Sequence, residues 1–448
     1  MPIRSRRRTA PRCVSSLWDE RKADPPLSTP ISVCDDATCR ANASTMTESK
    51  NNGPLAGIRI IDLTSVILGP YATQILADFG ADVIKVEAPS GDIMRHVGPM
   101  RHPGMGHIYL NLNRNKRSIA LDLKQPTARD ALRKLAATAD VFVTNVRPAA
   151  MARLGLGYDD ICAVNPRIVY ASATGYGAGG RYAGKPAYDD LIQGLTGIAA
   201  IPRDAWGGEP RYMPIAIADR TVGLYLANAI SAALFHRERT GQGQAIEIPM
   251  FEVFSEYLLG DHLAGLTFDP PEGPQYYPRL VSKHRRPYAT ADGHVCALVY
   301  TDTHWKNFFR AIDREDLLQD PRFSTHGNRA KNIDEVYQFV ADILKTRTTV
   351  DWVTLLDAAD IPVMPLNSIE SLLDDPHLNE AGFFRLVDHP TEGKLRTTQV
   401  PGSWSASSPS VRNLAPSLGE HTEELLREAG LSDEEIADIT DAPGKPPG

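Results

Sequence analysis

The segment Ile58-Arg-Ile-Ile-Asp-Leu63 and the later segment Ala81-Asp-Val-Ile-Lys-Val-Glu87 decide the fold of the first half of the chain. Both are short apolar runs rich in β-branched residues, which is typical of buried strands. Between them, the sequence predicts a turn from Ser65 to Pro70 and a short helix from Tyr71 to Phe79. A strand, a helix and a second strand in this order predict a βαβ unit, and such units form parallel sheets.

The same alternation continues downstream. Further elements are expected as strands at Ser118–Leu123, Val141–Val143 and Ile168–Ser172, with helices at Thr127–Thr138 and Tyr158–Val164. Alternating strands and helices predict an open, doubly wound α/β domain. The turn after the first strand has no Gly-x-Gly-x-x-Gly pattern, so a nicotinamide cofactor is not supported.

The second half of the chain is organised differently. Pro, Gly and Tyr dominate from Phe268 to Tyr277, which indicates a linker. The elements expected after it form a smaller α/β domain: a hairpin over Tyr288–Tyr300 that turns at Asp292-Gly293, and helices at His304–Ala311, Ile333–Leu344 and Val350–Ala358. Short strand-like pieces then follow Asp375-Pro376, and a polar helix is expected near Glu420 to Ala429.

The composition limits the possible partners. The chain has 448 residues and a net charge of −7, and its basic residues do not cluster over the body, so neither nucleic acid nor a membrane surface is indicated. No apolar run approaches the length of a transmembrane helix. The five cysteines are widely spread, without metal-ligand spacing or a disulfide framework. This usage suggests a reducing, cytoplasmic location and no bound metal.

Residues 1–52 are expected to be a disordered N-terminal extension or a misassigned start. Five arginines fall within the first twelve positions, and Pro, Ser, Thr and Asp follow without periodicity. The segment lacks the apolar core of a secretory signal. Met46 begins a plausible native N-terminus.

A long Ala-rich segment that begins near Asp219 contains the strongest candidate for chemistry. Pro214-Ile-Ala-Ile-Ala-Asp219 leads into an apolar pattern with a helical period that stops at Thr240-Gly241. Asp219 is therefore expected at the start of a long helix, where the helix dipole should keep the pKa of its carboxyl low. Two interpretations of Asp219 remain open from these residues: a helix N-cap, or an ionised and partly desolvated nucleophile.

Several stretches together resemble one family, the class III CoA-transferases (CaiB/BaiF family), across residues 54–438. The stretches that carry the resemblance are Pro54–Thr64, Gly80–Glu87 with Gly91-Asp92, Asn113–Lys124, Asp140–Asn145, Gly184–Gln193, Thr240–Gln244 and Leu418–Thr422. Each stretch alone would be a weak signal, but their occurrence in this order makes chance agreement improbable.

The resemblance implies a fold and an assembly. Members of the family have a large Rossmann-like, CoA-binding domain built from both chain ends, which here corresponds to residues 53–265 and 376–448. Their small domain comes from the middle of the chain, here residues 266–375 together with a linker. Two chains of the family are threaded through each other as an interlocked homodimer.

The resemblance also implies the chemistry. The family's nucleophile aligns with Asp219, which would attack the thioester of a donor acyl-CoA to form a mixed anhydride and then an aspartyl-CoA thioester. A carboxylic acid acceptor then takes the CoA, so acyl-CoA is a substrate and no tightly bound cofactor is expected. Asp189 aligns with an acid near the reaction centre in some members, with a helix N-cap as an equal alternative.

The positions that match the family's CoA contacts are Ser65, Val66, Ile67, Leu68, Leu121, Lys124, Asn145, Val146, Arg153 and Leu154. Lys124 and Arg153 suit phosphate groups by their charge, with solvated surface charge as the alternative. Ala88 stands where a relative has an arginine, so that contact is in doubt.

Two other functions are weighed against CoA transfer. An α-methylacyl-CoA racemase of the same superfamily would use an acid/base pair to move a proton, but that branch has a histidine where this chain has Tyr188. A non-catalytic CoA-binding protein is the second alternative, and the intact Asp219 argues against it. His236, His284 and His294 fit no triad spacing, and His284-Arg-Arg286 faces either an acidic substrate or solvent.

Overall fold

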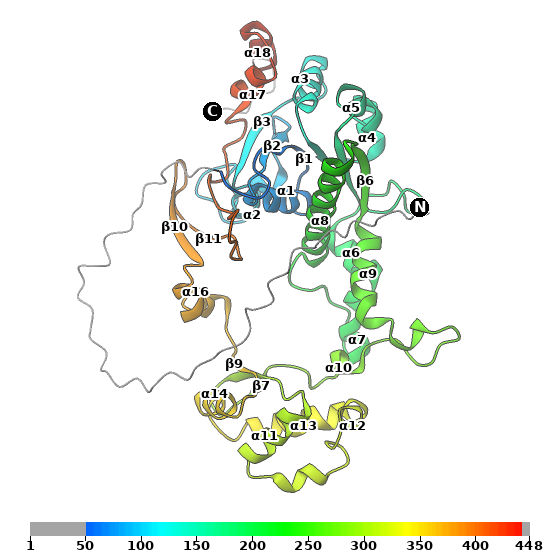
Figure 1. Ribbon diagram of the computed structural model, residues 1–448, viewed down its shortest axis with the longest axis vertical. Coiled ribbons are helices and arrows are strands. Elements are labelled where there is room, and N and C mark those ends of the chain that lie inside the picture. The colour runs from blue at the N-terminus through cyan, green and yellow to red at the C-terminus, as the bar shows by residue number, and fades with distance from the viewer. Residues whose placement is uncertain (1–50, 441–448) are drawn as a thin grey trace, which may run out of the picture. The chain divides into compact units, whose positions relative to one another are not determined.

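Residues 51–440 are described by the computed structural model (Figure 1). The expectation of a disordered extension over residues 1–52 falls almost entirely outside this range. None of the helices within residues 51–440 is long and apolar enough to cross a membrane.

A six-stranded parallel sheet lies at the centre of the fold. Its strands, in the order β3-β2-β1-β4-β5-β6, are β3 (Lys116–Ala120), β2 (Asp82–Glu87), β1 (Arg59–Leu63), β4 (Val141–Thr144), β5 (Val169–Thr174) and β6 (Gln244–Pro249). This is the strand order of a doubly wound, Rossmann-type sheet, and it confirms the predicted parallel α/β architecture. Strand β6 was not predicted from the sequence.

Strand β3 begins at Lys116, two positions before the expected start at Ser118. The sequence pattern places two charged residues outside the strand. In the fold, however, Lys116 is buried in the sheet and its ammonium group pairs with the carboxylate of Asp62 at 3.1 Å. A charge neutralised by a residue from another strand can therefore occupy a core position.

Helices cover both faces of the sheet (Figure 1). Adjacent residues of β1 point to opposite faces, so that Ile60 belongs to one core and Ile61 to the other. The first core is completed by α1 (Leu68–Asp78), α6 (Asp189–Thr196), α8 (Ile217–Thr240) and α9 (Met250–His262). The second is completed by α3 (Pro126–Ala137), α4 (Pro148–Leu154), α5 (Tyr158–Val164), α17 (Thr422–Glu428) and α18 (Asp433–Thr440).

The C-terminal helices belong to the same core as the N-terminal strands. Leu425 and Leu426 of α17 and Ile436 of α18 are buried in the second core together with residues of β1 and β2. The sheet-containing part thus draws on both ends of the described chain. The domain boundaries expected at residues 265 and 376 remain a prediction.

Residues 288–365 build a third core around a small antiparallel sheet. The sheet has the order β7-β8-β9, and its elements are β7 (Tyr288–Ala289), β8 (His294–Ala297), β9 (Val363–Pro365), α11 (Asp302–Ala311), α12 (His326–Lys331), α13 (Ile333–Leu344) and α14 (Thr349–Ala358). The pairing of β7 with β8 confirms the hairpin predicted around Asp292-Gly293. A second antiparallel hairpin follows, formed by β10 (Phe384–His389) and β11 (Gly393–Thr398).

The remaining helical segments connect these parts. They are η1 (Ile93–His96), α2 (His107–Leu112), η2 (Ile198–Ala200), α7 (Ile201–Trp206), η3 (Ala264–Thr267), α10 (Pro278–Val281), η4 (Glu315–Gln319), α15 (Ile369–Leu372) and α16 (Pro376–Glu380).

Candidate active site

The carboxyl ends of β1 and β4 meet where the strand order of the sheet reverses direction. Ser65 follows β1 and Asn145 follows β4, and two hydrogen bonds join them. The backbone N–H of Ser65 donates to Oδ1 of Asn145 at 3.1 Å, and Nδ2 of Asn145 donates to the carbonyl oxygen of Ser65 at 2.9 Å. Ligands of open α/β sheets bind outside the carboxyl ends of the strands at such a point. The fold therefore joins two segments of the predicted CoA site.

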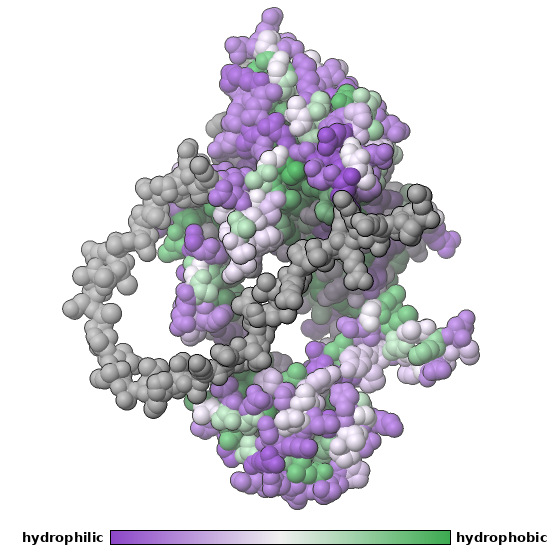
Figure 2. All heavy atoms as spheres, in the orientation of Figure 1, coloured by the Kyte–Doolittle hydropathy of each residue, from purple (hydrophilic) through white to green (hydrophobic). Residues whose placement is uncertain are grey.

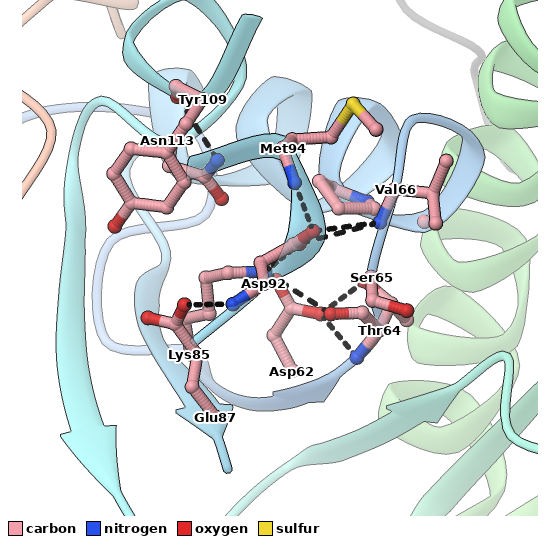
Figure 3. A network of polar contacts seen from close by, with 12 residues as sticks. Asp62, Thr64, Ser65, Val66, Lys85, Glu87, Asp92, Met94, Tyr109 and Asn113 are labelled. Carbon is pink, nitrogen blue, oxygen red and sulfur yellow. Dashed lines mark hydrogen bonds and ion pairs between the residues drawn. The ribbon is translucent and has the colours of Figure 1, made fainter. Parts of the chain in front are cut away.

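The first turn, which we define as residues 64–68, has an uncommon backbone conformation. Val66 lies in the left-handed region with a φ of 73°, and its N–H donates to both carboxylate oxygens of Asp92 at 3.2 Å. The carbonyl oxygen of Thr64 accepts a hydrogen bond of 3.0 Å from Nζ of Lys85. Figure 3 shows these side chains beneath the turn. The turn is thus fixed by buried residues from β2 and from the loop after it.

The other predicted CoA contacts lie near the same edge of the sheet but differ in exposure. Lys124 and Arg153 are exposed, and within residues 51–440 neither forms an ion pair. Leu68 and Leu121 are 7% and 1% exposed, since their side chains belong to the two cores. These two leucines therefore offer little surface to a ligand. Ile67, Val146 and Leu154 are half-buried.

Asp219 lies in the first turn of α8, as the sequence predicts, and the helix ends at Gly241 in the left-handed conformation. Ala216 occupies the N-cap position, and no side chain caps the helix from there. The N-cap interpretation of Asp219 is therefore wrong. Asp219 is only 9% exposed, and no donor in the described part of the chain forms a hydrogen bond with its carboxylate.

Asp189 contacts Asp219 through the backbone. Its Oδ1 atom accepts a hydrogen bond of 2.9 Å from the N–H of Asp219. Although Asp189 is the first residue of α6, Tyr188 is the N-cap of that helix, and Asp189 instead satisfies a free N–H at the start of α8. The N-cap alternative for Asp189 is therefore wrong, because its carboxylate bonds a backbone N–H of α8 and caps no helix from the N-cap position.

Gln193 holds Asp189 in place, and the sequence analysis missed it. Its Nε2 donates to Oδ2 of Asp189 at 2.6 Å, and its Oε1 accepts from the N–H of Met213 at 2.8 Å. Gln193 is fully buried. The spacing of four residues between Asp189 and Gln193 on one helix was the available signal, because such residues are neighbours on the helix surface.

The pKa of Asp219 is raised to about 7. Burial is the largest cause, the carboxylate of Asp189 is the second, and Arg220 opposes them by lowering the pKa. The low pKa expected from the helix dipole is therefore wrong. Removal from water and a second carboxylate outweigh the partial charge of the helix terminus, whose influence is modest.

The start of α8 packs against the start of α1, directly beside the first turn. A Cβ atom on Gly223 would lie only 2.8 Å from the carbonyl oxygen of Leu68, so glycine permits this approach. The guanidinium group of Arg220 lies 4.5 Å from the ring centroid of Tyr71. This packing brings the Asp219 region to the predicted CoA turn.

Residues outside this region show little that suggests catalysis. No group of three or more metal-ligating side chains occurs within residues 51–440. A cavity of about 70 Å³ lies within residues 277–337, and its lining includes Tyr277, Arg279, Tyr300, Trp305 and Tyr337. None of the predicted site residues lines it.

Comparisons with known proteins agree with the predicted family. The sequence model of CoA-transferase family III matches residues 55–422. A formyl-CoA:oxalate CoA-transferase of Escherichia coli O157:H7 is 33% identical over 413 residues, which cover 86% of this chain and 97% of that protein. A human succinyl-CoA:glutarate CoA-transferase is 31% identical over 387 residues, which cover 85% of this chain and 87% of that protein.

Solved structures are similar over the same range. The crystal structure of Rv3272 from Mycobacterium tuberculosis has a TM-score of 0.72 and 30% identity, and covers 83% of this chain and 98% of its own. A CaiB/BaiF family protein from Brucella suis has a TM-score of 0.71 and 30% identity, with 84% of this chain and all of its own covered. By sequence over most of its length and by fold, the chain belongs to CoA-transferase family III.

Proposed function

We propose that this protein moves CoA from an acyl-CoA donor to a carboxylic acid, with Asp219 as the covalent nucleophile. The observation that carries the proposal is the state of Asp219: the residue is only 9% exposed, no donor among the described residues bonds its carboxylate, and α8 packs against Leu68 of the first turn at Gly223, one helical turn further on. A carboxylate without donors keeps its lone pairs for attack on a carbonyl carbon.

The proposed reaction has four balanced steps. A carboxylate oxygen of Asp219 attacks the thioester carbonyl carbon and the C–S bond breaks. CoA leaves as a thiolate, and the acyl group remains on Asp219 as a mixed anhydride. The thiolate then attacks the aspartyl carbonyl carbon, which releases the donor acid and leaves an aspartyl-CoA thioester. The acceptor carboxylate attacks the aspartyl carbonyl carbon of this thioester, the C–S bond breaks, and the thiolate is released again as a second mixed anhydride forms between Asp219 and the acceptor. The thiolate finally attacks the acceptor's acyl carbon, which forms the new acyl-CoA and frees Asp219.

The surroundings of Asp219 suit this sequence of steps. Each attack creates negative charge near the N-terminus of α8, where the helix dipole favours it. Burial raises the pKa of Asp219 and so makes its ionised form more reactive than a solvated carboxylate. Asp189 contacts the backbone of Asp219 rather than its carboxylate, which leaves the attacking oxygens open.

CoA itself would bind at the carboxyl edge of the sheet. Its phosphate groups require cations and backbone donors. The exposed Lys124 and Arg153 supply charge there, and Asn145 and the first turn supply the adjoining surface. Ser65, Val66, Ile67, Leu68, Leu121, Val146 and Leu154 complete the proposed contact set.

We also propose that the active assembly is an interlocked homodimer. Large apolar side chains are exposed on α6, α8 and α9, among them Tyr188, Leu191, Leu224, Tyr225, Phe235 and Tyr257, each between 48% and 63% exposed. Figure 2 shows apolar side chains gathered on the visible face near α8. A second copy of the chain would cover such a surface, because exposed apolar patches of this kind mark association sites.

A racemase is the second candidate, and one observation favours it. A pKa of about 7 for Asp219 suits proton transfer near neutral pH as well as nucleophilic attack. A racemase needs a second acid/base group that supplies a proton while the first removes one. At the position where that branch has histidine, this chain has Tyr188, which is 63% exposed. We therefore rank CoA transfer first.

One experiment separates the candidates. The protein is incubated with a panel of acyl-CoA donors and free acids, including oxalate and glutarate, and the CoA products are identified by mass spectrometry. CoA transfer predicts a new acyl-CoA, and trapping with hydroxylamine or borohydride should then modify Asp219 alone. Exchange of an α-proton for deuterium without any new acyl-CoA would instead support the racemase.

A further inference from the structure

The conformation of Val66 is energetically unfavourable by itself. A β-branched residue with a φ of 73° is an outlier, because its side chain crowds the backbone in the left-handed region. Such strain persists only where the surroundings enforce it. It therefore matters which contacts hold Val66.

Asp92 is the residue that holds Val66. Its two carboxylate oxygens accept the Val66 N–H at 3.2 Å each, and one of them also accepts the N–H of Met94 at 3.0 Å. The other forms an ion pair of 3.0 Å with Nζ of Lys85. The Lys85 ammonium also binds the carbonyl oxygen of Thr64, so the pair holds the turn at two points (Figure 3).

Asp92 is itself rigidly placed. Its N–H donates to Oε1 of Glu87 at 3.1 Å, and Glu87 forms a buried ion pair of 2.6 Å with Arg95. The side chains of Lys85 and Asp92 are 0% and 1% exposed. A buried ion pair is weak evidence for stability, since apolar residues of similar volume often stabilise as well. Asp92 also caps η1 through the Met94 N–H, but a cap does not need a lysine, whereas Lys85 and Asp92 together bond two backbone groups of the first turn.

We propose that Asp92, with Lys85 as its counter-ion, is a positioning residue that keeps Val66 left-handed and so presents the first turn in the conformation that binds CoA. This inference rests on the proposed binding of CoA at that turn. A turn fixed in advance binds its ligand without an ordering cost at the moment of association.

The test removes both charges together, because a single substitution would leave one buried charge unpaired. The double variant Asp92→Ala/Lys85→Met is compared with wild type for its Kd towards CoA by isothermal titration calorimetry. We expect binding about tenfold weaker. Adding Val66→Gly should restore the Kd to within about threefold of wild type, because glycine adopts a positive φ without strain.

The matched control is another buried ion pair at the opposite end of α1. Asp78 and Arg114 pair at 2.8 Å with side chains 6% and 10% exposed, and neither touches the first turn. The variant Asp78→Ala/Arg114→Met should lose stability but bind CoA as wild type does.

The outcomes are distinct. Equal loss of CoA affinity in both double variants, or no rescue by Val66→Gly, overturns the positioning role and leaves the proposed function intact. Wild-type affinity in Asp92→Ala/Lys85→Met does the same. Failure of the wild-type protein itself to bind CoA removes the proposed function and, with it, this inference.

Discussion

The Oδ1 atom of Asp189 accepts a hydrogen bond of 2.9 Å from the backbone N–H of Asp219. This contact places a second carboxylate next to the proposed nucleophile without occupying the oxygens that would react. It also removes one donor that could have stabilised the Asp219 charge. The raised pKa of Asp219 follows from burial together with this neighbour, and several predictions can be made from it.

Replacing Asp219 by asparagine should abolish turnover and increase stability at alkaline pH. Asparagine cannot act as the nucleophile, so we expect the rate to fall by several orders of magnitude. The pKa of Asp219 in the folded protein, about 7, lies above its value in the unfolded chain. The free energy of unfolding of wild type therefore declines as pH rises from about 4 to 7, because Asp219 must ionise in a buried site, and it stays lowered by the same amount above pH 7. The penalty is at most on the order of 4 kcal/mol. In thermal melts, the melting temperature of Asp219→Asn relative to that of wild type should be higher at pH 8 than at pH 5. A difference in melting temperature between variant and wild type that is the same at both pH values would contradict this.

The activity of the wild-type enzyme should depend on pH through the ionisation of Asp219. Because only the carboxylate attacks, kcat/KM should rise with pH and level off above about 7. In Asp189→Asn the like charge is removed while an amide oxygen can still accept the Asp219 N–H. The midpoint of the profile should therefore move to lower pH, although burial still keeps it above the ordinary value for Asp. Rate profiles between pH 5 and 9 measure this, and an unmoved midpoint would exclude the role assigned to Asp189.

Replacing Gln193 by leucine should reduce kcat more than it weakens CoA binding. The change removes the hydrogen bonds of Gln193 to Oδ2 of Asp189 and to the N–H of Met213, each of which contributes about 0.5–1.5 kcal/mol. The control is Gln338→Leu, since Gln338 forms a comparable bond to Asp342, four residues away, on the exposed surface of α13. Steady-state kinetics and melting curves should show a lower kcat for Gln193→Leu than for Gln338→Leu. Similar effects of the two substitutions would argue against a special role for Gln193.

Replacing Gly223 by alanine should destabilise the fold and lower activity. Alanine improves helix propensity by about 1 kcal/mol, but its Cβ would lie 2.8 Å from the Leu68 carbonyl oxygen, a backbone atom that cannot move cheaply. The contact should outweigh propensity and push α8 away from α1. At Gly260 in α9, nothing among the described residues beyond its two neighbours and the backbone of its own helix lies within 4 Å of the position that a Cβ would take, so Gly260→Ala should stabilise by about 1 kcal/mol without changing activity. In denaturant unfolding, the free energy of unfolding should fall in Gly223→Ala and rise in Gly260→Ala, and activity assays should show a loss only in Gly223→Ala.

The exposed apolar side chains of α8 predict association in solution. Light scattering at micromolar concentration should give twice the mass of one chain, and Leu224→Glu, at a site 53% exposed, should reduce that mass and the activity together. Val350→Glu, at an apolar site of α14 that is 72% exposed, serves as the control for adding a charge outside α6, α8 and α9. A wild-type protein that is monomeric and fully active would rule out the proposed assembly.

Much of the fold could be read from local patterns. The apolar runs at β1 and β2 predict the parallel sheet, because burial on both faces requires nearly continuous apolar residues. The positive φ of Gly241 ends α8 where Thr240-Gly241 predicts the stop. The family follows from motifs spread along the chain and is confirmed by its sequence model. The strands and the helix stop depend on residues close together in the sequence, and each of the family's motifs is itself a short local segment.

The state of the candidate site depends on residues far apart in the sequence. Asp189 precedes Asp219 by 30 positions, and only the packing of α6 against α8 brings their groups to hydrogen-bond distance. Asp92 holds Val66 from 26 positions away, and Lys116 becomes a core residue because Asp62 on another strand neutralises it. The sequence by itself determined five of the six strands of the parallel sheet and the family, since periodicity and motifs are local. The tertiary structure decided the pKa of Asp219 and the conformation of the first turn, because desolvation and charge–charge interaction depend on distances that exist only after folding.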